Sequence, residues 1–269
     1  MQQAIAVLDS GVGGLTVVKE IMRQLPREKI IYFGDTARSP YGPRPAVEVK
    51  MFTRQIVAYL LQFKPKMIVI ACNTATAVAL NDIREMTEIP VVGVIHPGAR
   101  AAIKVTRNGV IGVIGTEGTI NSKSYEQALE SISPHLEVHS LACPLLVPLV
   151  ERGLFDTEEV RETVYQSLRP LLDTNIDCLI LGCTHYPFLE HVIQSVVGPD
   201  ITLISSADET AREVSTILYH RDMLARSDEI PVHQFFCSGD PVIFQRIAHR
   251  WLGNQIRVFP VVWQVPNIM

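Results

Sequence analysis

The sequence lacks several features that would point to a membrane or to nucleic acid. Its 269 residues contain no uninterrupted run of the ~20 apolar residues that a membrane span needs, so we expect no membrane association. Lys and Arg number 24 against 28 Asp and Glu, which gives a net charge of -4, and no basic cluster is present to attract a phosphate backbone. We therefore expect no nucleic acid as the primary ligand.

Signals for secretion, disulfide bonding and pyridoxal chemistry are also missing. The N-terminal segment has neither the charged region nor the long apolar region of a secretory signal, which predicts a cytoplasmic protein. The five cysteines are dispersed without a C-x-x-C pair, which argues against a disulfide framework or a zinc cluster. None of the seven lysines resembles the Schiff-base lysine of a pyridoxal phosphate enzyme. We expect no metal and no cofactor.

What the chain does contain is a regular alternation of short apolar runs and amphipathic segments. Between the runs, apolar residues recur at helical spacing, as at Leu15, Val18, Met22 and Leu25. Asp156 with Glu159, and Ser206 with Glu209, are typical of helix starts. The pattern predicts an α/β fold whose parallel strands are buried on both faces. The eight runs cover residues 4–10, 29–35, 66–73, 89–95, 109–116, 136–143, 177–184 and 200–206.

The spacing of these runs repeats. The stretch from Asp9 to Cys72 is nearly as long as the stretch from Thr116 to Cys183, and in each a second strand begins at nearly the same distance from the start. A further strand follows each cysteine at a similar interval. Similar loop lengths could produce this by coincidence, but an internal duplication explains all the intervals together. We therefore predict two pseudo-symmetric, flavodoxin-like parallel-sheet domains with the active site in the cleft between them.

The domain boundaries follow from the repeat. The first domain is predicted at residues 1–96 and the second at residues 97–207. The segment 208–269 contains a helix, a strand, a second helix and a second strand, and it has no counterpart between the two repeats. We assign it to the first domain as a returning C-terminal extension.

Two cysteines occupy equivalent positions in the repeats. Cys72 in IACNTAT and Cys183 in LGCTHYP each follow a buried strand and precede small polar residues. Ligands of parallel sheets bind beyond the carboxyl ends of the strands, so the two thiols are expected on opposite walls of one cleft. Either cysteine alone could be a buried structural thiol, but the pair predicts catalysis.

Facing thiols suit one reaction in particular, which removes a proton from one face of a carbon and returns a proton to the other. One sulfur must be a thiolate, which a helix N-terminus or His185 could favour, while a drier partner stays protonated. The remaining cysteines have no such pairing, and Cys143 is interpreted as structural.

Further candidate residues follow other strands. Asp9 begins DSGVGGLT, a glycine-rich turn that could present N–H groups to an anion or be a plain tight turn, and its carboxylate could bind a substrate ammonium. Tyr41 and Gly42 lie in GDTARSPYGPRP, which could be a ligand-holding loop or a surface turn. Glu151 is costly if buried and ordinary if exposed.

Six motifs together resemble the glutamate racemase family of the cofactor-independent aspartate/glutamate racemase superfamily. They span most of the chain in the family's order: DSGVGGLTV (9–17), GDTARSPYGPR (34–44), IACNTAT (70–76), GVIGTEGTI (112–120), ACPLLVPLVE (142–151) and LILGCTHYP (179–187).

The resemblance implies interconversion of L- and D-glutamate without metal or pyridoxal phosphate, which supplies D-glutamate for peptidoglycan. Cys72 and Cys183 match the two catalytic thiols, with Cys72 acting on D-glutamate and Cys183 on L-glutamate. Asp9, Glu151 and His185 match auxiliary polar residues. A homodimer is compatible with the resemblance. The positions that match contacts to the substrate are Ser10, Tyr41, Gly42, Asn73, Thr74, Thr116 and Thr184.

Two alternatives remain at this point. The chain could be a different racemase of the superfamily, acting on aspartate or on hydantoins. Aspartate differs from glutamate by one methylene, which is worth only about 1–3 kcal/mol of discrimination. A non-catalytic two-domain binder could clamp an amino acid in the same cleft.

Overall fold

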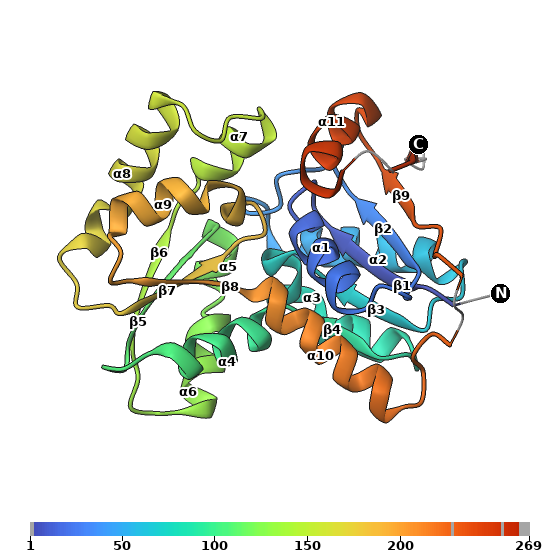
Figure 1. The fold of residues 1–269 in the computed structure, drawn as a ribbon, viewed down its shortest axis with the longest axis horizontal. Helices are drawn as coiled ribbons and strands as arrows, with labels where there is room; N and C mark the ends of the chain where they lie inside the picture. Colours follow the sequence, from blue (N-terminus) through green and yellow to red (C-terminus); the bar gives the residue numbers. More distant parts are fainter. Residues whose placement is uncertain (1–2, 227–228, 254–255, 264–269) are drawn as a thin grey trace.

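The structure is a computed structural model that describes residues 3–226, 229–253 and 256–263. These residues form two lobes, each built on a parallel sheet, which lie side by side (Figure 1). The first lobe contains a six-stranded sheet in the order β10-β9-β2-β1-β3-β4, and the second a four-stranded sheet in the order β6-β5-β7-β8. The predicted α/β fold with two parallel-sheet domains is confirmed.

All the sheet pairings are parallel. The strands of the first sheet are β1 (Ile5–Asp9), β2 (Ile30–Gly34), β3 (Met67–Ile70), β4 (Val91–Gly93), β9 (Gln234–Cys237) and β10 (Val258–Pro260). Those of the second are β5 (Val110–Gly115), β6 (Glu137–Ala142), β7 (Cys178–Gly182) and β8 (Thr202–Ser205). Each of the eight predicted apolar runs contains one of the strands β1 to β8.

Helices connect the strands and cover both faces of each sheet. They are α1 (Leu15–Gln24), α2 (Ala46–Leu61), α3 (Asn73–Met86), α4 (Ile95–Val105), α5 (Glu117–Asn121), α6 (Ser124–Ile132), α7 (Leu146–Glu151), α8 (Glu158–Leu172), α9 (Glu190–Val197), α10 (Ser206–His220), α11 (Pro241–Leu252) and the 3₁₀ helix η1 (Tyr186–Leu189). No helix within the described ranges is long and apolar enough to cross a membrane.

Two of the predicted helix starts are displaced by one residue. Helix α8 is capped by Thr157, whose side chain accepts a hydrogen bond from Val160 N, rather than by Asp156. Helix α10 is capped by Ser205, which accepts from Ala207 N, rather than by Ser206. In both places a neighbouring hydroxyl residue has the extended backbone that a cap requires.

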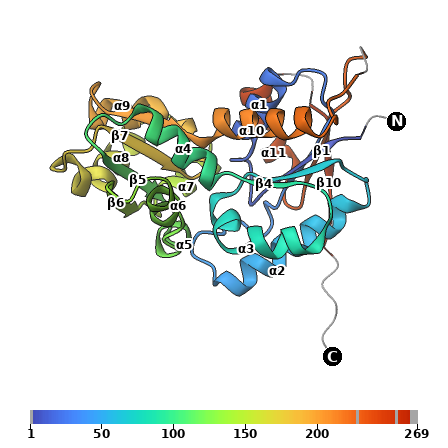
Figure 2. The same ribbon diagram turned by 90° about the horizontal axis from the view of Figure 1, so that it is seen from below.

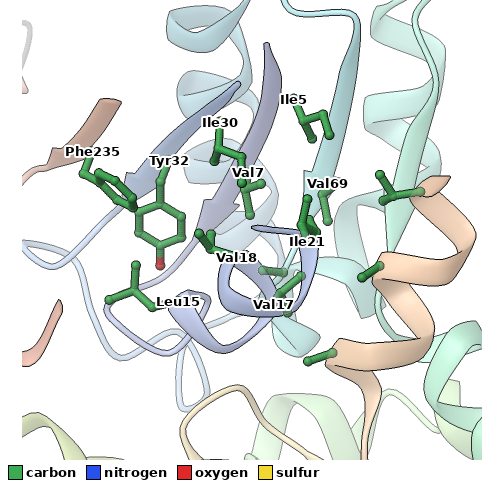
Figure 3. Packing of buried hydrophobic residues seen from close by; sticks show 14 of the residues in the cluster. Ile5, Val7, Leu15, Val17, Val18, Ile21, Ile30, Tyr32, Val69 and Phe235 are labelled. Atoms are coloured by element: carbon green, nitrogen blue, oxygen red, sulfur yellow. The ribbon is translucent and has the colours of Figure 1, made fainter. Parts of the chain in front are cut away.

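Each sheet lies between two layers of helices, although the edge strand β6 has no fully buried residue, in contrast to the prediction for its apolar run. In the first lobe, α1, α10 and α11 pack on one face and α2 and α3 on the other (Figure 2). Figure 3 shows the first of these layers, where Val17, Val18 and Ile21 of α1 pack against Ile5 and Val7 of β1. In the second lobe, α7, α8 and α9 cover one face and α4 and α6 the other.

The same strand order occurs in both lobes. The strand order β2-β1-β3-β4 in the first sheet corresponds to the order β6-β5-β7-β8 in the second. The segment after α10 adds β9 and β10 to the first sheet, beyond β2, and has no equivalent in the second. Loops after β1, β2 and β3 thus correspond to loops after β5, β6 and β7.

Candidate active site

A small cavity lies where the carboxyl ends of the two sheets meet. It is lined by residues of both lobes, and ten of the twelve candidates from the sequence are among them. These are Ser10, Tyr41, Gly42, Cys72, Asn73, Thr74, Thr116, Cys183, Thr184 and His185. Pro40 and Val147 also line it and had not been singled out. Asp9 and Glu151 lie behind the lining and contact it.

Cys72 follows β3 and is the N-cap of α3. Its sulfur accepts a hydrogen bond from Ala75 N at 3.4 Å and lies 3.7 Å from Ser10 Oγ. Burial, together with the negative charge of Asp9, nevertheless raises the pKa of the Cys72 thiol to about 12. The helix N-terminus therefore does not outweigh desolvation, which favours the neutral thiol of Cys72.

Cys183 follows β7 on the opposite lobe and has a different environment. Its sulfur lies 3.8 Å from His185 Nδ1, and His185 Nε2 lies 2.6 Å from Glu151 Oε1. Burial by itself would lower the pKa of His185, but the hydrogen bonds to Cys183 and Glu151 raise it well above its ordinary value. A protonated imidazole thus faces the Cys183 sulfur.

Asp9 at the end of β1 is fully buried and joins the two lobes. Its Oδ1 accepts a hydrogen bond from Gly11 N at 2.9 Å, and its Oδ2 accepts one from the Thr184 hydroxyl at 3.1 Å. Burial raises the pKa of Asp9, while the neighbouring His185 and these hydrogen bonds offset part of that effect. Asp9 therefore places a carboxyl group directly behind both cavity walls.

Glycines of the first lobe allow the second lobe to approach. A Cβ atom on Gly13 would lie 2.3 Å from Thr184 Oγ1, and one on Gly42 would lie 2.5 Å from Thr116 Cβ. The glycine-rich turn after β1 could be an anion-binding turn or a plain tight turn, and at Gly13 it packs closely against the loop that carries Cys183.

Two polar contacts across the lobes were not foreseen. Thr119, in α5, lies 3.2 Å from Thr74 and 3.1 Å from Thr116 through the hydroxyl oxygens. Tyr125, in α6, donates its hydroxyl to Asn73 Oδ1 at 2.7 Å. The amide nitrogen of Asn73 is buried and has no hydrogen-bond partner within the described residues. It is a donor that is free for a ligand in the cavity.

The other cysteines have structural surroundings. Cys143 is buried behind the Cys183 wall, where burial raises its pKa to about 12, and its carbonyl accepts a hydrogen bond from Tyr186. Cys178 opens β7 inside the second core, and Cys237 ends β9 in the first. None of the three lines the cavity.

The arrangement supports proton transfer on two faces of one small molecule. Burial favours the neutral thiol of Cys72. Cys183 faces the imidazole of His185, which is held by the Glu151 carboxylate. Hydroxyl and amide donors surround the space between them, as an anionic ligand requires. Within the described ranges, no group of three or more His, Cys, Asp or Glu side chains has an arrangement that could hold a metal ion.

Comparison with known proteins gives consistent matches. The sequence model of the Asp/Glu/hydantoin racemase family matches residues 5–214. A glutamate racemase from Bacillus cereus is 56% identical over 256 residues, which cover 95% of each chain.

Solved structures agree in fold and coverage. The crystal structure of a glutamate racemase isoform from Bacillus anthracis matches with a TM-score of 0.93 and 56% identity, covering 96% of this chain and 97% of the other. A glutamate racemase from Francisella tularensis, crystallised in complex with D-glutamate, matches with a TM-score of 0.90 and 33% identity over 98% of each chain. The resemblance found in the motifs is confirmed.

Proposed function

Because the chain belongs to the Asp/Glu/hydantoin racemase family of isomerases, we propose that it interconverts L- and D-glutamate with Cys72 and Cys183 as the two proton carriers. One observation carries the proposal: the two thiols come from different lobes, line the same cavity and have opposed electrostatic environments. The glutamate racemases of similar sequence and structure support glutamate as the substrate.

The reaction begins with Cys183 as a thiolate beside the His185 imidazolium. The sulfur removes the Cα proton of L-glutamate, so the C–H bond breaks, an S–H bond forms, and the electron pair is delocalised into the α-carboxylate. The Cys72 thiol then delivers its proton to the opposite face of Cα. D-glutamate results, and the reverse reaction uses the two sulfurs in exchanged roles.

The remaining candidates are proposed to hold the substrate. The Asn73 amide nitrogen, which is buried and unpartnered among the described residues, suits a substrate carboxylate oxygen. Asp9 lies behind the wall and is proposed to act on the ammonium group through Thr184, which lines the cavity and donates to Asp9 Oδ2. Ser10, Tyr41, Gly42, Thr74, Thr116 and Thr184 complete the contacts to the two carboxylates and the ammonium.

We further propose a cytoplasmic protein, and a homodimer, whose D-glutamate enters peptidoglycan synthesis. The homodimer is supported by the family resemblance alone. Light scattering on the purified protein would test it, and a monomer at all accessible concentrations would contradict it.

The decisive experiment measures solvent deuterium incorporation at Cα of glutamate together with racemisation followed by circular dichroism. Cys72→Ala and Cys183→Ala are each expected to abolish racemisation. Cys143→Ala, a buried cysteine outside the cavity, is the matched control and should retain most activity. Racemisation by Cys183→Ala at the rate of the unsubstituted protein would refute the two-thiol mechanism.

The same assay separates the alternatives. L-Aspartate is tested in parallel with L-glutamate. Faster turnover of L-aspartate would show that aspartate, and not glutamate, is the substrate. A non-catalytic binder would bind an amino acid without any deuterium exchange.

A further inference from the structure

Asp35 is a fully buried carboxylate that lies outside the cavity, directly after β2. Its Oδ2 accepts hydrogen bonds from Arg38 Nε at 2.6 Å and from the Tyr41 hydroxyl. Its Oδ1 accepts hydrogen bonds from the Ser238 hydroxyl at 2.7 Å and from Trp263 Nε1 at 2.9 Å. Four donors thus satisfy both oxygens of one buried charge.

The Oδ2 side of Asp35 fixes a loop of the cavity wall. Tyr41 is almost entirely buried, and it lines the cavity together with Gly42. The Gly42 carbonyl accepts a hydrogen bond from Gly118 N of the second lobe at 2.8 Å, so the loop also contacts the facing wall. The side chain of Asp35 is therefore one hydrogen bond away from the proposed substrate contacts.

The Oδ1 side of Asp35 connects the same loop to the end of the chain. Ser238 follows β9 and Trp263 follows β10, the two strands that have no counterpart in the second lobe. The indole ring of Trp263 also packs on Arg38, whose guanidinium carbon lies 4.3 Å from the Trp263 ring centroid and 4.2 Å from that of Phe52. The C-terminal extension thus reaches the cavity wall through Asp35 and Arg38.

We propose that Asp35 is a positioning residue for glutamate binding, which holds the loop of Tyr41 and Gly42 in place and is itself held by Trp263 and Ser238. The inference rests on the proposed function, since it takes Tyr41 and Gly42 as substrate contacts. Asp35 touches neither thiol, so its effect is on binding of the substrate in ground and transition state alike.

The chemistry of the four donors defines a sharp test. Arg38 Nε and Trp263 Nε1 can only donate, whereas the two hydroxyls can donate or accept. In Asp35→Asn one of the two oxygens becomes an NH₂ group, and a donor-only neighbour faces it in either orientation of the amide. The substitution therefore disturbs the loop although it barely changes the volume.

The experiment compares kcat and KM of the full chain for both enantiomers, with glutamate affinity measured by calorimetry. For Asp35→Asn we expect KM to rise about tenfold or more, with kcat changed much less, from the loss of a buried charged hydrogen bond. Adding Trp263→Phe removes one donor-only group, so the double variant should recover part of the lost affinity. Trp263→Phe alone should raise KM by about threefold.

The control is Glu28→Gln, which alters another buried carboxylate. Glu28 is 2% exposed and pairs with Lys66 before β2 begins, on the side of the sheet away from the cavity. This variant should lose stability but keep its KM. A folded Asp35→Asn protein with unchanged KM, or an equal KM change in Glu28→Gln, would overturn the proposal.

Two further outcomes of the experiment are also decisive. Should Asp35→Asn fail to fold, unchanged KM values in both Trp263→Phe and Ser238→Ala would overturn the proposal. Should the unsubstituted protein bind glutamate without racemising it, the proposed function fails, while the calorimetric affinities of the variants still decide the role of Asp35.

Discussion

Glu151 Oε1 lies 2.6 Å from His185 Nε2, at the end of the short helix α7. The other ring nitrogen of His185 faces Cys183 at 3.8 Å. The carboxylate therefore orients the imidazole and favours its protonated form, which lies beside the Cys183 sulfur. Glu151 acts on the thiol through His185 without lining the cavity.

Replacing Glu151 by Gln should move the pH dependence of activity. His185 has a raised pKa, so its positive charge is present below that pKa and is lost as the pH rises through it. Loss of the carboxylate lowers the pKa of His185, and the alkaline limb of kcat/KM for L-glutamate should shift to lower pH. In the alkaline range we expect kcat/KM to fall by about tenfold.

The matched control is Glu159→Gln, which removes an exposed carboxylate paired with Arg152. Its pH profile should equal that of the unsubstituted protein. If Glu151→Gln kept its alkaline limb in place, the charge on His185 would not depend on Glu151.

Gly13→Ala should separate the lobes at the Cys183 loop. The added Cβ would lie 2.3 Å from Thr184 Oγ1 and 2.6 Å from His185 Nδ1, so the loop must shift. A displacement of this size at reacting groups lowers the rate by about a hundredfold, which a racemisation assay at saturating glutamate would detect. Gly153→Ala is the control, because nothing lies within 4 Å of that Cβ and only the positive φ disfavours it. Equal activity of the two variants would contradict the packing role of Gly13.

Much of the fold could be predicted because each parallel strand is an apolar run that ends in a small or polar residue. The runs 4–10 and 109–116 begin the two repeats. The matched spacing after them predicted two similar domains, and the two sheets share the order of four strands. The starts of α8 and α10 were each predicted one residue away from the observed cap. Asp156 and Thr157 can both cap a helix, and only the backbone conformation decides between them.

The candidate site was predictable where it lies at strand ends, as with Cys72 and Cys183. It was not predictable where it depends on how the lobes pack. Tyr125 reaches Asn73 from the face of a helix in the other lobe, and no local pattern marks it. The contact between Asp35 and Trp263 joins residues 228 positions apart through an extension that the repeat does not include. Such contacts are fixed by tertiary structure alone.

Tyr125→Phe should weaken substrate binding. The phenol donates to Asn73 Oδ1 at 2.7 Å, which turns the amide nitrogen of Asn73 toward the cavity. Without that hydrogen bond the amide is free to rotate, and we expect KM to rise by about threefold to tenfold with a smaller change in kcat. Tyr165→Phe, at an exposed tyrosine, is the control. An unchanged KM for Tyr125→Phe would show that Asn73 needs no partner for its orientation.

Lys66→Met should lower stability without changing the chemistry. Lys66 and Glu28 are 5% and 2% exposed, and their charged atoms lie 2.6 Å apart. Lys66 also donates to Met223 O, and Glu28 accepts from Ala225 N, so the pair holds the loop after α10. Removing one partner leaves a buried charge. We therefore expect the free energy of unfolding, measured in urea, to fall by about 3–5 kcal/mol. The control Arg212→Ala, at an exposed pair, should lower it by less than about 1 kcal/mol.

Replacing Glu28 by Leu as well should restore most of the stability, because the unpaired charge is then gone. Racemisation at room temperature should stay near that of the unsubstituted protein in both variants, and a large loss of activity in folded Lys66→Met protein would show that this pair also supports the site.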